Sequence, residues 1–374
     1  MLNFLDLKTL SFIDDLIYQN DECYHLPVDY INGIQTNLIR ESFKYHYNKC
    51  QLYKNYCDKL KVGPDDIAGN DDLVKIPLIP SILFKDYNIM SCNPFEIVKT
   101  CTSSGTKGSI SKIFRDEVTM ERFMGSIQCC LDQMMNLDDA FCINLGPTTE
   151  EAGDLWFSYA MSLVDLIYPS EYFVIDDVFY PDNAYKKILE EKNNYENIIL
   201  IGAPIMFLEL VNYMEKNNLK IESCENFYFL TAGGWKRFSG SEIPKPEFIK
   251  MTKKFFINAQ EKYFRDILNM VELNTVLPEC ELKVKHLPPW VKVMILDPIY
   301  LNPVKDGEYG LMAYLDPSTT SYPGFILTDD VGKIVVSGKC QCGRYGQGIE
   351  ILRRIGRVES RGCALKIDKH YSTV

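Results

Sequence analysis

Hydrophobic residues recur at different spacings in successive parts of the chain. From residue 5 to about residue 60, apolar and aromatic side chains return at helical intervals among polar ones, which predicts a helical N-terminal segment. Farther along, helical patterns over residues 183–194 and 204–217 alternate with short apolar runs at residues 198–202 and 227–234. Such an alternation predicts a parallel sheet covered by helices, with ligands bound where the strands end.

Beyond about residue 280 the hydrophobic runs become short and are separated by prolines, which predicts strands rather than helices. The predicted strands are residues 291–296, 310–315, 325–328, 333–337 and 349–355. We therefore expect an α/β fold with a helical N-terminal preface, a parallel-sheet core and a β-rich subdomain near the C-terminus.

A segment rich in hydroxyl groups and glycine, TSSGTKG, lies between two predicted strands at residues 95–101 and 111–114, and a predicted helix follows at residues 117–135. Glycine lets the backbone approach a ligand closely, and the hydroxyl groups and the lysine can bind phosphate. This spacing is not that of a P-loop NTPase, because no Gly-Lys-Ser/Thr sequence closes the segment. An ordinary turn between strands is the alternative. The candidate phosphate-binding residues are Thr102, Ser103, Ser104, Gly105, Thr106, Lys107 and Gly108.

Charge and cysteine content narrow the functional classes. The 374-residue chain carries 40 basic and 51 acidic side chains, a formal net charge of -11, which argues against broad binding of nucleic acid or anionic lipid. The N-terminus has acidic residues where a secretory signal has basic ones, and the longest apolar stretch, residues 198–211, is too short and too interrupted to span a membrane. We expect a cytoplasmic protein whose 13 cysteines are reduced.

Two pairs of potential metal ligands flank the β-rich segment. Cys280 and His286 precede it, and Cys340 and Cys342 lie near its end. Three thiolates and one imidazole form a ligand set of structural zinc. The alternatives are that these cysteines are packing residues, since Cys-X-Cys is tighter than the usual Cys-X-X-Cys, and that His286, which comes shortly before two prolines, is a hydrogen-bonded turn residue.

Motif-like segments occur in a fixed order along nearly the whole chain. They are IPLIPSILFK (76–85), TSSGTKGSISK (102–112), IGAP (201–204), TAGGWK (231–236), NMVE (269–272), HLPPWVKVMILDP (286–298), LTDDVG (327–332), CQCGRYG (340–346) and GRVESRGCALKI (356–367). This order resembles the adenylate-forming superfamily and, within it, the LuxE family of acyl-protein synthetases. The phosphate-loop pattern is typical of the superfamily, whereas HLPPW and the late RGC point to the family.

The resemblance implies an AMP-forming acid-thiol ligase. Such an enzyme uses ATP and Mg²⁺ to convert a fatty or other carboxylic acid to an acyl adenylate, and it then transfers the acyl group to a protein thiol. The implied partners are the acid and an acyl reductase, an acyl carrier or coenzyme A. Two other functions remain open at this point: an acyl- or aryl-CoA ligase of the phenylacetate-CoA ligase type, and a non-catalytic module that binds a nucleotide or docks a partner.

The resemblance also implies roles for individual residues. The segment 102–108 is expected to hold the phosphates, with Lys107 neutralising negative charge, and Glu272 is expected to bind Mg²⁺. Asp330 is expected to contact the ribose hydroxyl groups. Asp329 is the alternative residue for this contact, and either aspartate could instead cap a turn after a strand. The residues expected around the nucleoside are Gly233, Gly234 and Trp235 at the adenine, Asp330 at the ribose, and Arg357 at the ribose or a phosphate.

Cys363, in the RGC sequence, is the acyl acceptor that the resemblance implies. Arg361 and Lys366 lie nearby and could favour its thiolate form. The alternatives are that Cys363 is a buried packing residue and that the acceptor is an external thiol of coenzyme A or a carrier protein.

The resemblance further predicts how the chain is divided. Residues 1–355 are expected to form the large adenylate-forming domain, and residues 356–374 a C-terminal stub that carries Cys363. The small lid domain of most adenylate-forming enzymes is then truncated, and its lysine has no counterpart. Within the large domain, the expected parts are the helical preface 1–90, the α/β core 91–279 and the β-rich subdomain 280–355.

Overall fold

The N-terminal part of the molecule is helical, as predicted. The structure is a computed structural model that describes residues 12–104, 110–233 and 243–354. On the second helix, buried residues such as Ile34, Leu38 and Phe43 recur at helical spacing and form one apolar face. This face packs on a sheet strand, because the Phe43 and Phe325 ring centroids lie 6.1 Å apart. The helices are α1 (Phe12–Tyr18), α2 (Val28–Lys49) and α3 (Gln51–Leu60).

The centre of the chain forms the predicted parallel sheet, whose strand order is β11-β10-β9-β8-β4-β5. Neighbouring strands in it run parallel except for β11, which is antiparallel to β10. The strands at residues 198–202 and 227–234 are confirmed as β8 and β9. The bounds are β4 (Ala140–Asn144), β5 (Ser170–Tyr172), β8 (Asn197–Gly202), β9 (Phe227–Ala232), β10 (Phe264–Leu268) and β11 (Leu277–Pro278).

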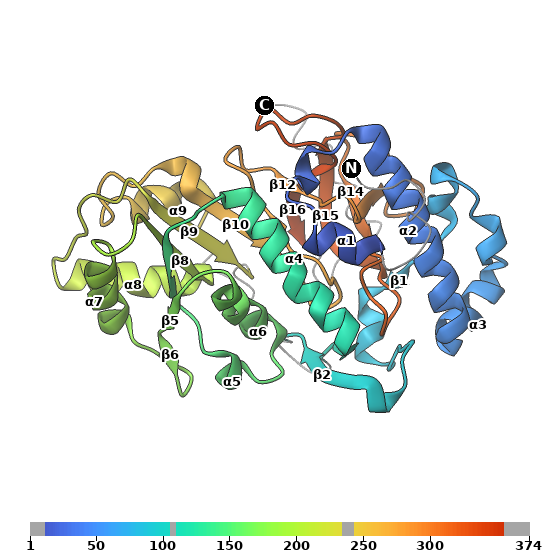
Figure 1. The fold of residues 1–374 in the computed structure, drawn as a ribbon, viewed down its shortest axis with the longest axis horizontal. Coiled ribbons are helices and arrows are strands. Elements are labelled where there is room, and N and C mark those ends of the chain that lie inside the picture. Colours follow the sequence, from blue (N-terminus) through green and yellow to red (C-terminus); the bar gives the residue numbers. More distant parts are fainter. Residues whose placement is uncertain (1–11, 105–109, 234–242, 355–374) are drawn as a thin grey trace.

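Helices cover both faces of this sheet (Figure 1). Side chains alternate along β9, so that Phe227 and Phe229 join a hydrophobic cluster with α7, α8 and α9, while Tyr228 and Leu230 join the cluster that contains α4. None of the helices in the described ranges combines the length and the apolar character needed to cross a bilayer. The helices are α4 (Glu117–Met135), α5 (Thr149–Ala152), α6 (Trp156–Ser162), α7 (Pro181–Glu191), α8 (Pro204–Lys216) and α9 (Lys245–Thr252).

The C-terminal third forms a second sheet in the order β12-β16-β15-β14-β13, and the short β1 pairs with β15. The predicted β-rich texture of this region is confirmed. Two small hairpins lie outside both large sheets, β2 with β3 and β6 with β7. The remaining bounds are β1 (Ile79–Pro80), β2 (Ile97–Thr102), β3 (Lys112–Asp116), β6 (Val174–Ile175), β7 (Val178–Phe179), β12 (Lys285–His286), β13 (Lys292–Leu296), β14 (Gly310–Leu315), β15 (Phe325–Val336) and β16 (Gly348–Arg354).

The two strands predicted at residues 325–328 and 333–337 are one continuous strand, β15. The alternative in which Asp329 or Asp330 caps a turn after a strand is therefore wrong. Asp330 stays in register with Arg354 of β16, and the register shifts at the next step, between Val331 and Gly332. A Cβ atom at Gly332 would lie 2.5 Å from the carbonyl oxygen of Glu350, so this glycine permits close strand approach rather than a chain reversal.

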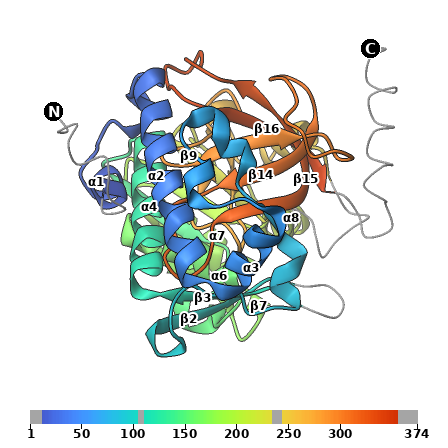
Figure 2. The same ribbon diagram turned by 90° about the vertical axis from the view of Figure 1, so that its right-hand side faces the viewer.

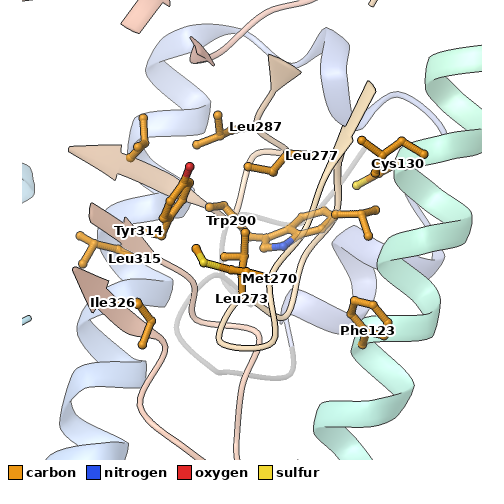
Figure 3. Packing of buried hydrophobic residues seen from close by; sticks show 14 of the residues in the cluster. Phe123, Cys130, Met270, Leu273, Leu277, Leu287, Trp290, Tyr314, Leu315 and Ile326 are labelled. Atoms are coloured by element: carbon orange, nitrogen blue, oxygen red, sulfur yellow. The ribbon is translucent and has the colours of Figure 1, made fainter. Parts of the chain in front are cut away.

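The main hydrophobic core lies between α4 and the second sheet (Figure 3). Trp290 is fully buried at its centre, with Phe123 of α4 on one side and Tyr314 of β14 on the other. The Trp290 indole nitrogen donates a hydrogen bond to Thr275 Oγ1 at 3.1 Å. The segment that contains Thr275 follows β10, so this core also supports the loop at the end of the parallel sheet.

Asp116 joins the start of α4 to the loop between β14 and β15. Its carboxylate caps the helix by accepting a hydrogen bond from Thr119 N at 2.9 Å, and it accepts another from Thr320 Oγ1 at 2.8 Å. We expect Asp116→Ala to lower the free energy of unfolding by about 1–2 kcal/mol, because the cap is lost. Urea unfolding measures this effect. Asp116→Asn keeps a good capping side chain and should lose less; equal losses in both variants would contradict the capping role.

Candidate active site

The candidate phosphate loop connects the two strands of the β2–β3 hairpin, and it begins where Thr102 of β2 pairs with Lys112 of β3 (Figure 2). Thr102 donates to the carbonyl oxygen of Asp154 from both its backbone nitrogen, at 2.7 Å, and its hydroxyl group, at 3.0 Å. Ser103 Oγ accepts a hydrogen bond from Ser111 N at 3.0 Å. The bond between Ser103 and Ser111 joins the two ends of the loop, and the Thr102 bonds attach its start to the segment before α6. Ser104 is partly buried, whereas the predicted residues Gly105, Thr106, Lys107 and Gly108 lie outside the described residues.

The first turn of α6 contacts three of the segments singled out from the sequence. Leu155, which precedes the helix, forms a β-bridge with Thr102. The Trp156 indole nitrogen donates a hydrogen bond to Asn269 Oδ1 at 2.6 Å. The ring of Phe157 lies where a Cβ atom at Gly233 would be. The structure thus brings the phosphate loop, the TAGG segment and the NMVE segment around one turn of helix.

Gly233 is the described part of the predicted adenine-binding segment. Its φ angle is +80°, a conformation that favours glycine, and a side chain there would collide with Phe157. The position therefore requires glycine for two independent reasons. Gly234 and Trp235, predicted beside it, lie outside the described residues.

Glu272 lies in the loop after β10 and is only 5% exposed. Its carbonyl oxygen accepts a hydrogen bond from the Tyr322 hydroxyl group at 3.3 Å. The Asn269 side-chain amide donates to the carbonyl oxygens of Leu273 and Thr275, both at 3.0 Å. The backbone that carries Glu272 is therefore fixed from both sides.

Arg115 is a residue of this site that sequence reasoning missed. It is fully buried on β3, and its guanidinium carbon lies 3.6 Å from the ring centroid of Trp156. Its Nη2 atom donates to the Val271 carbonyl oxygen at 2.8 Å, and its Nε atom to Asn274 Oδ1 at 3.2 Å. Its Nη1 atom has no hydrogen-bond partner within the described ranges. The positively charged guanidinium group of Arg115 thus lies beside the Glu272 loop. In the sequence, the only indication of this role was an arginine within a short strand of alternating pattern.

Asp330 lies on β15, in the second sheet. Its backbone nitrogen donates to Thr328 Oγ1 at 3.1 Å, and its Oδ1 atom is 3.7 Å from Arg354 Nε. None of the contacts described for Asp330 involves α6, the phosphate loop or the Glu272 loop. Among the described residues, the structure therefore shows no direct contact between Asp330 and the residues that meet at α6. Arg357 and Cys363 fall outside the described residues.

The predicted metal ligands Cys280, His286, Cys340 and Cys342 converge at another place. Their ligand atoms all lie within 4.8 Å of one another, and Cys342 Sγ is 3.4 Å from His286 Nε2. Cys280 directly follows the β11 region and His286 lies on β12, while Cys340 and Cys342 form a turn before β16. Figure 1 shows β12 and β16 well away from β2 and α6.

Known proteins resemble this chain in sequence and in fold. A long-chain-fatty-acid--luciferin-component ligase of Aliivibrio fischeri is 36% identical over 363 residues, which covers 96% of this chain and 93% of that protein. The corresponding ligase of Vibrio harveyi is 31% identical and covers 96% of this chain and 94% of that protein.

Among solved structures, a 2-hydroxyisobutyryl-CoA ligase in complex with 2-HIB-AMP and CoA covers 91% of this chain and 72% of that chain, with a TM-score of 0.66 and 12% identity. An open conformation of the same ligase gives a TM-score of 0.67 and 12% identity and covers 92% of this chain and 80% of that chain. The predicted fold class is thereby confirmed. The family model for acyl-protein synthetase, LuxE, matches residues 2–372, and the chain therefore belongs to the LuxE family of acyl-protein synthetases.

Proposed function

We propose that this protein activates a long-chain fatty acid with ATP and then carries the acyl group as a thioester on Cys363. In the first step a carboxylate oxygen attacks the α-phosphorus, the bond from that phosphorus to the bridging oxygen breaks, and pyrophosphate leaves. In the second step the Cys363 thiolate attacks the acyl carbon and AMP leaves. A free carboxylate is a poor electrophile, which is why the adenylate is needed.

The contacts around the first turn of α6 are the observation that carries this proposal. Adenylation requires hydrogen-bond donors to the phosphates, a nucleoside pocket and a metal-binding acid close to one another. Leu155, Trp156 and Phe157 contact, respectively, Thr102 of the phosphate loop, Asn269 of the Glu272 loop and Gly233 of the TAGG segment. Three distant stretches of sequence are joined there, one by a backbone bridge of the residue before α6 and two by side chains of its first turn.

The residues have distinct proposed roles. The backbone and hydroxyl groups of residues 102–108, together with Lys107, would bind the triphosphate, while Gly234 and Trp235 would border the adenine beside Gly233. Asp330 would contact the ribose, and Arg357 the ribose or a phosphate. Arg115 would act as a positioning residue, because it holds the backbone of the Glu272 loop at Val271.

Glu272 is the proposed ligand of Mg²⁺. A carboxylate is the donor that Mg²⁺ prefers, and Mg²⁺ is usually held by one or two carboxylates together with substrate phosphates. The low exposure of Glu272 and the hydrogen bonds that fix its loop fit this role. When bound, the metal would neutralise charge on the departing pyrophosphate.

Acid-dependent exchange of labelled pyrophosphate into ATP tests the proposal. We expect exchange with saturated fatty acids, none without acid, and none without Mg²⁺. A chain-length series then identifies the preferred substrate. Exchange with aryl or short acids alone would instead favour a CoA ligase of the phenylacetate type, and ATP binding without exchange for any acid would favour a non-catalytic module.

A further inference from the structure

We propose that Cys280, His286, Cys340 and Cys342 bind one structural zinc ion at a site distinct from the proposed acyl-transfer chemistry. Around tetrahedral zinc, with Zn–S near 2.3 Å and Zn–N near 2.0–2.1 Å, neighbouring ligand atoms lie about 3.6–3.8 Å apart. The four ligand atoms here all lie within 4.8 Å of one another, and the contact between Cys342 Sγ and His286 Nε2 is 3.4 Å. The side chains are thus already placed around one ion.

The imidazole of His286 is poorly satisfied by protein groups alone. The residue is fully buried, and its Nδ1 atom has no hydrogen-bond partner in the part of the chain that the structure describes. The Nε2 atom meets the sulfur of Cys342, a weak hydrogen-bond partner. Buried polar groups normally have good partners, so packing alone does not account for this ring. A cation between the four side chains would give Nε2 a strong one.

The ligand set favours a structural rather than a catalytic ion. Three cysteines and one histidine complete four-coordinate zinc from protein alone and leave no position for water or substrate. The three cysteines of this set are free thiols and form no disulfide, so all three sulfur atoms are available to a metal ion. Three thiolates and Zn²⁺ carry one net negative charge. Arg344, two residues after Cys342, provides positive charge and forms an ion pair with Glu281 at 3.1 Å.

The site lies where the two large sheets are joined. Cys280 and His286 belong to the hairpin between β11, in the parallel sheet, and β12, in the second sheet. Cys340 and Cys342 precede β16, which pairs with β12. Next to the ligands, Lys285 binds Asp266 of β10 at 2.8 Å. A zinc ion would therefore connect the chain segments that hold one sheet against the other, and its expected effect is on stability.

Metal analysis of the full-length, tag-free protein tests this proposal. We expect about one zinc ion per chain after purification without added metal. In the double variant Cys340→Ser/Cys342→Ser, the zinc content per chain should fall at least about tenfold, because two of the four ligands are gone. Cys224→Ser is the matched control, since Cys224 is a buried free thiol outside the cluster, and it should keep its zinc.

Two further measurements distinguish loss of the metal ligands from failure of a variant to fold. His286→Cys should retain zinc, because four thiolates also form a structural site, whereas His286→Ala should lose it. The wild-type protein reloaded with Co²⁺ should show the visible absorption of tetrahedral thiolate coordination. Wild-type protein without zinc, zinc that persists in the double variant, or iron with acid-labile sulfide in place of zinc would each overturn the proposal.

Discussion

Glu272→Gln is expected to lower the rate of fatty-acid-dependent ATP–pyrophosphate exchange by about a hundredfold, the scale of losing one electrostatic group that stabilises a transition state. The substitution removes the negative charge that would hold Mg²⁺ and leaves the side-chain shape almost unchanged. Because Mg²⁺ is bound less tightly, its half-saturating concentration should also rise. Exchange kinetics over a Mg²⁺ titration measure both effects.

The control for this variant is Glu261→Gln, the same change at an exposed acid that precedes β10. It should leave exchange and its dependence on Mg²⁺ unaltered. The thermal midpoint of Glu272→Gln is measured alongside, and Tyr322 and Arg115 still hold the backbone of the loop in this variant. An unchanged exchange rate in Glu272→Gln would exclude Glu272 as the metal ligand.

The regular part of the fold could be predicted because its elements are long enough to show their period. The helix at residues 117–135 is confirmed to the residue as α4, and the helix at residues 204–217 is α8, Pro204–Lys216. In both, buried positions recur every three or four residues, and Pro204 stands in the first turn, where it is tolerated. Local sequence contains this information, so no knowledge of distant partners is needed.

The parts that were missed depend on distant partners. α6 has only seven residues, too few to display a period, and its importance comes from contacts with Thr102, Asn269 and Gly233. Arg115 was missed because arginine is rarely buried, and here its burial depends on the Trp156 ring and on acceptors more than 150 residues away. LTDDVG was misread because aspartates and a glycine are typical of turns, whereas pairing with β16 extends the strand through them.

The cluster of three cysteines and one histidine shows how much residue type and spacing can predict. The sequence indicated Cys280, His286, Cys340 and Cys342 by residue type, although the two pairs are far apart along the chain. Their convergence depends on the antiparallel pairing of β12 with β16, in which His286 faces Gly348. Since Cys340 and Cys342 form a turn shortly before this strand, the pairing carries them to the histidine. Only strand pairing, which is non-local, could distinguish this outcome from ordinary buried cysteines.

Cys363→Ser is expected to abolish the thioester-linked protein while leaving acid-dependent ATP–pyrophosphate exchange intact. A thiolate is a far better nucleophile than a serine hydroxyl group at neutral pH, so the second step fails and the first does not. Incubation with labelled fatty acid and Mg-ATP, followed by denaturing electrophoresis with and without neutral hydroxylamine, measures the thioester. The wild type should carry hydroxylamine-sensitive label, and Cys363→Ser should show only background.

The control is Cys92→Ser, because Cys92 is partly exposed and lies outside the proposed zinc site, so that it tests whether any accessible thiol accepts the acyl group. Burial raises the pKa of Cys92 to about 11, which keeps it protonated at neutral pH and makes it a poor competitor. Its variant should be labelled like the wild type. Label that persists in Cys363→Ser would place the acceptor on another cysteine, and label that never forms on protein but moves to coenzyme A would assign the acceptor to a free thiol. Since exchange reports adenylation alone, the first result would exclude Cys363 as the acceptor and the second would exclude the acyl-protein step, and neither would contradict the adenylation step.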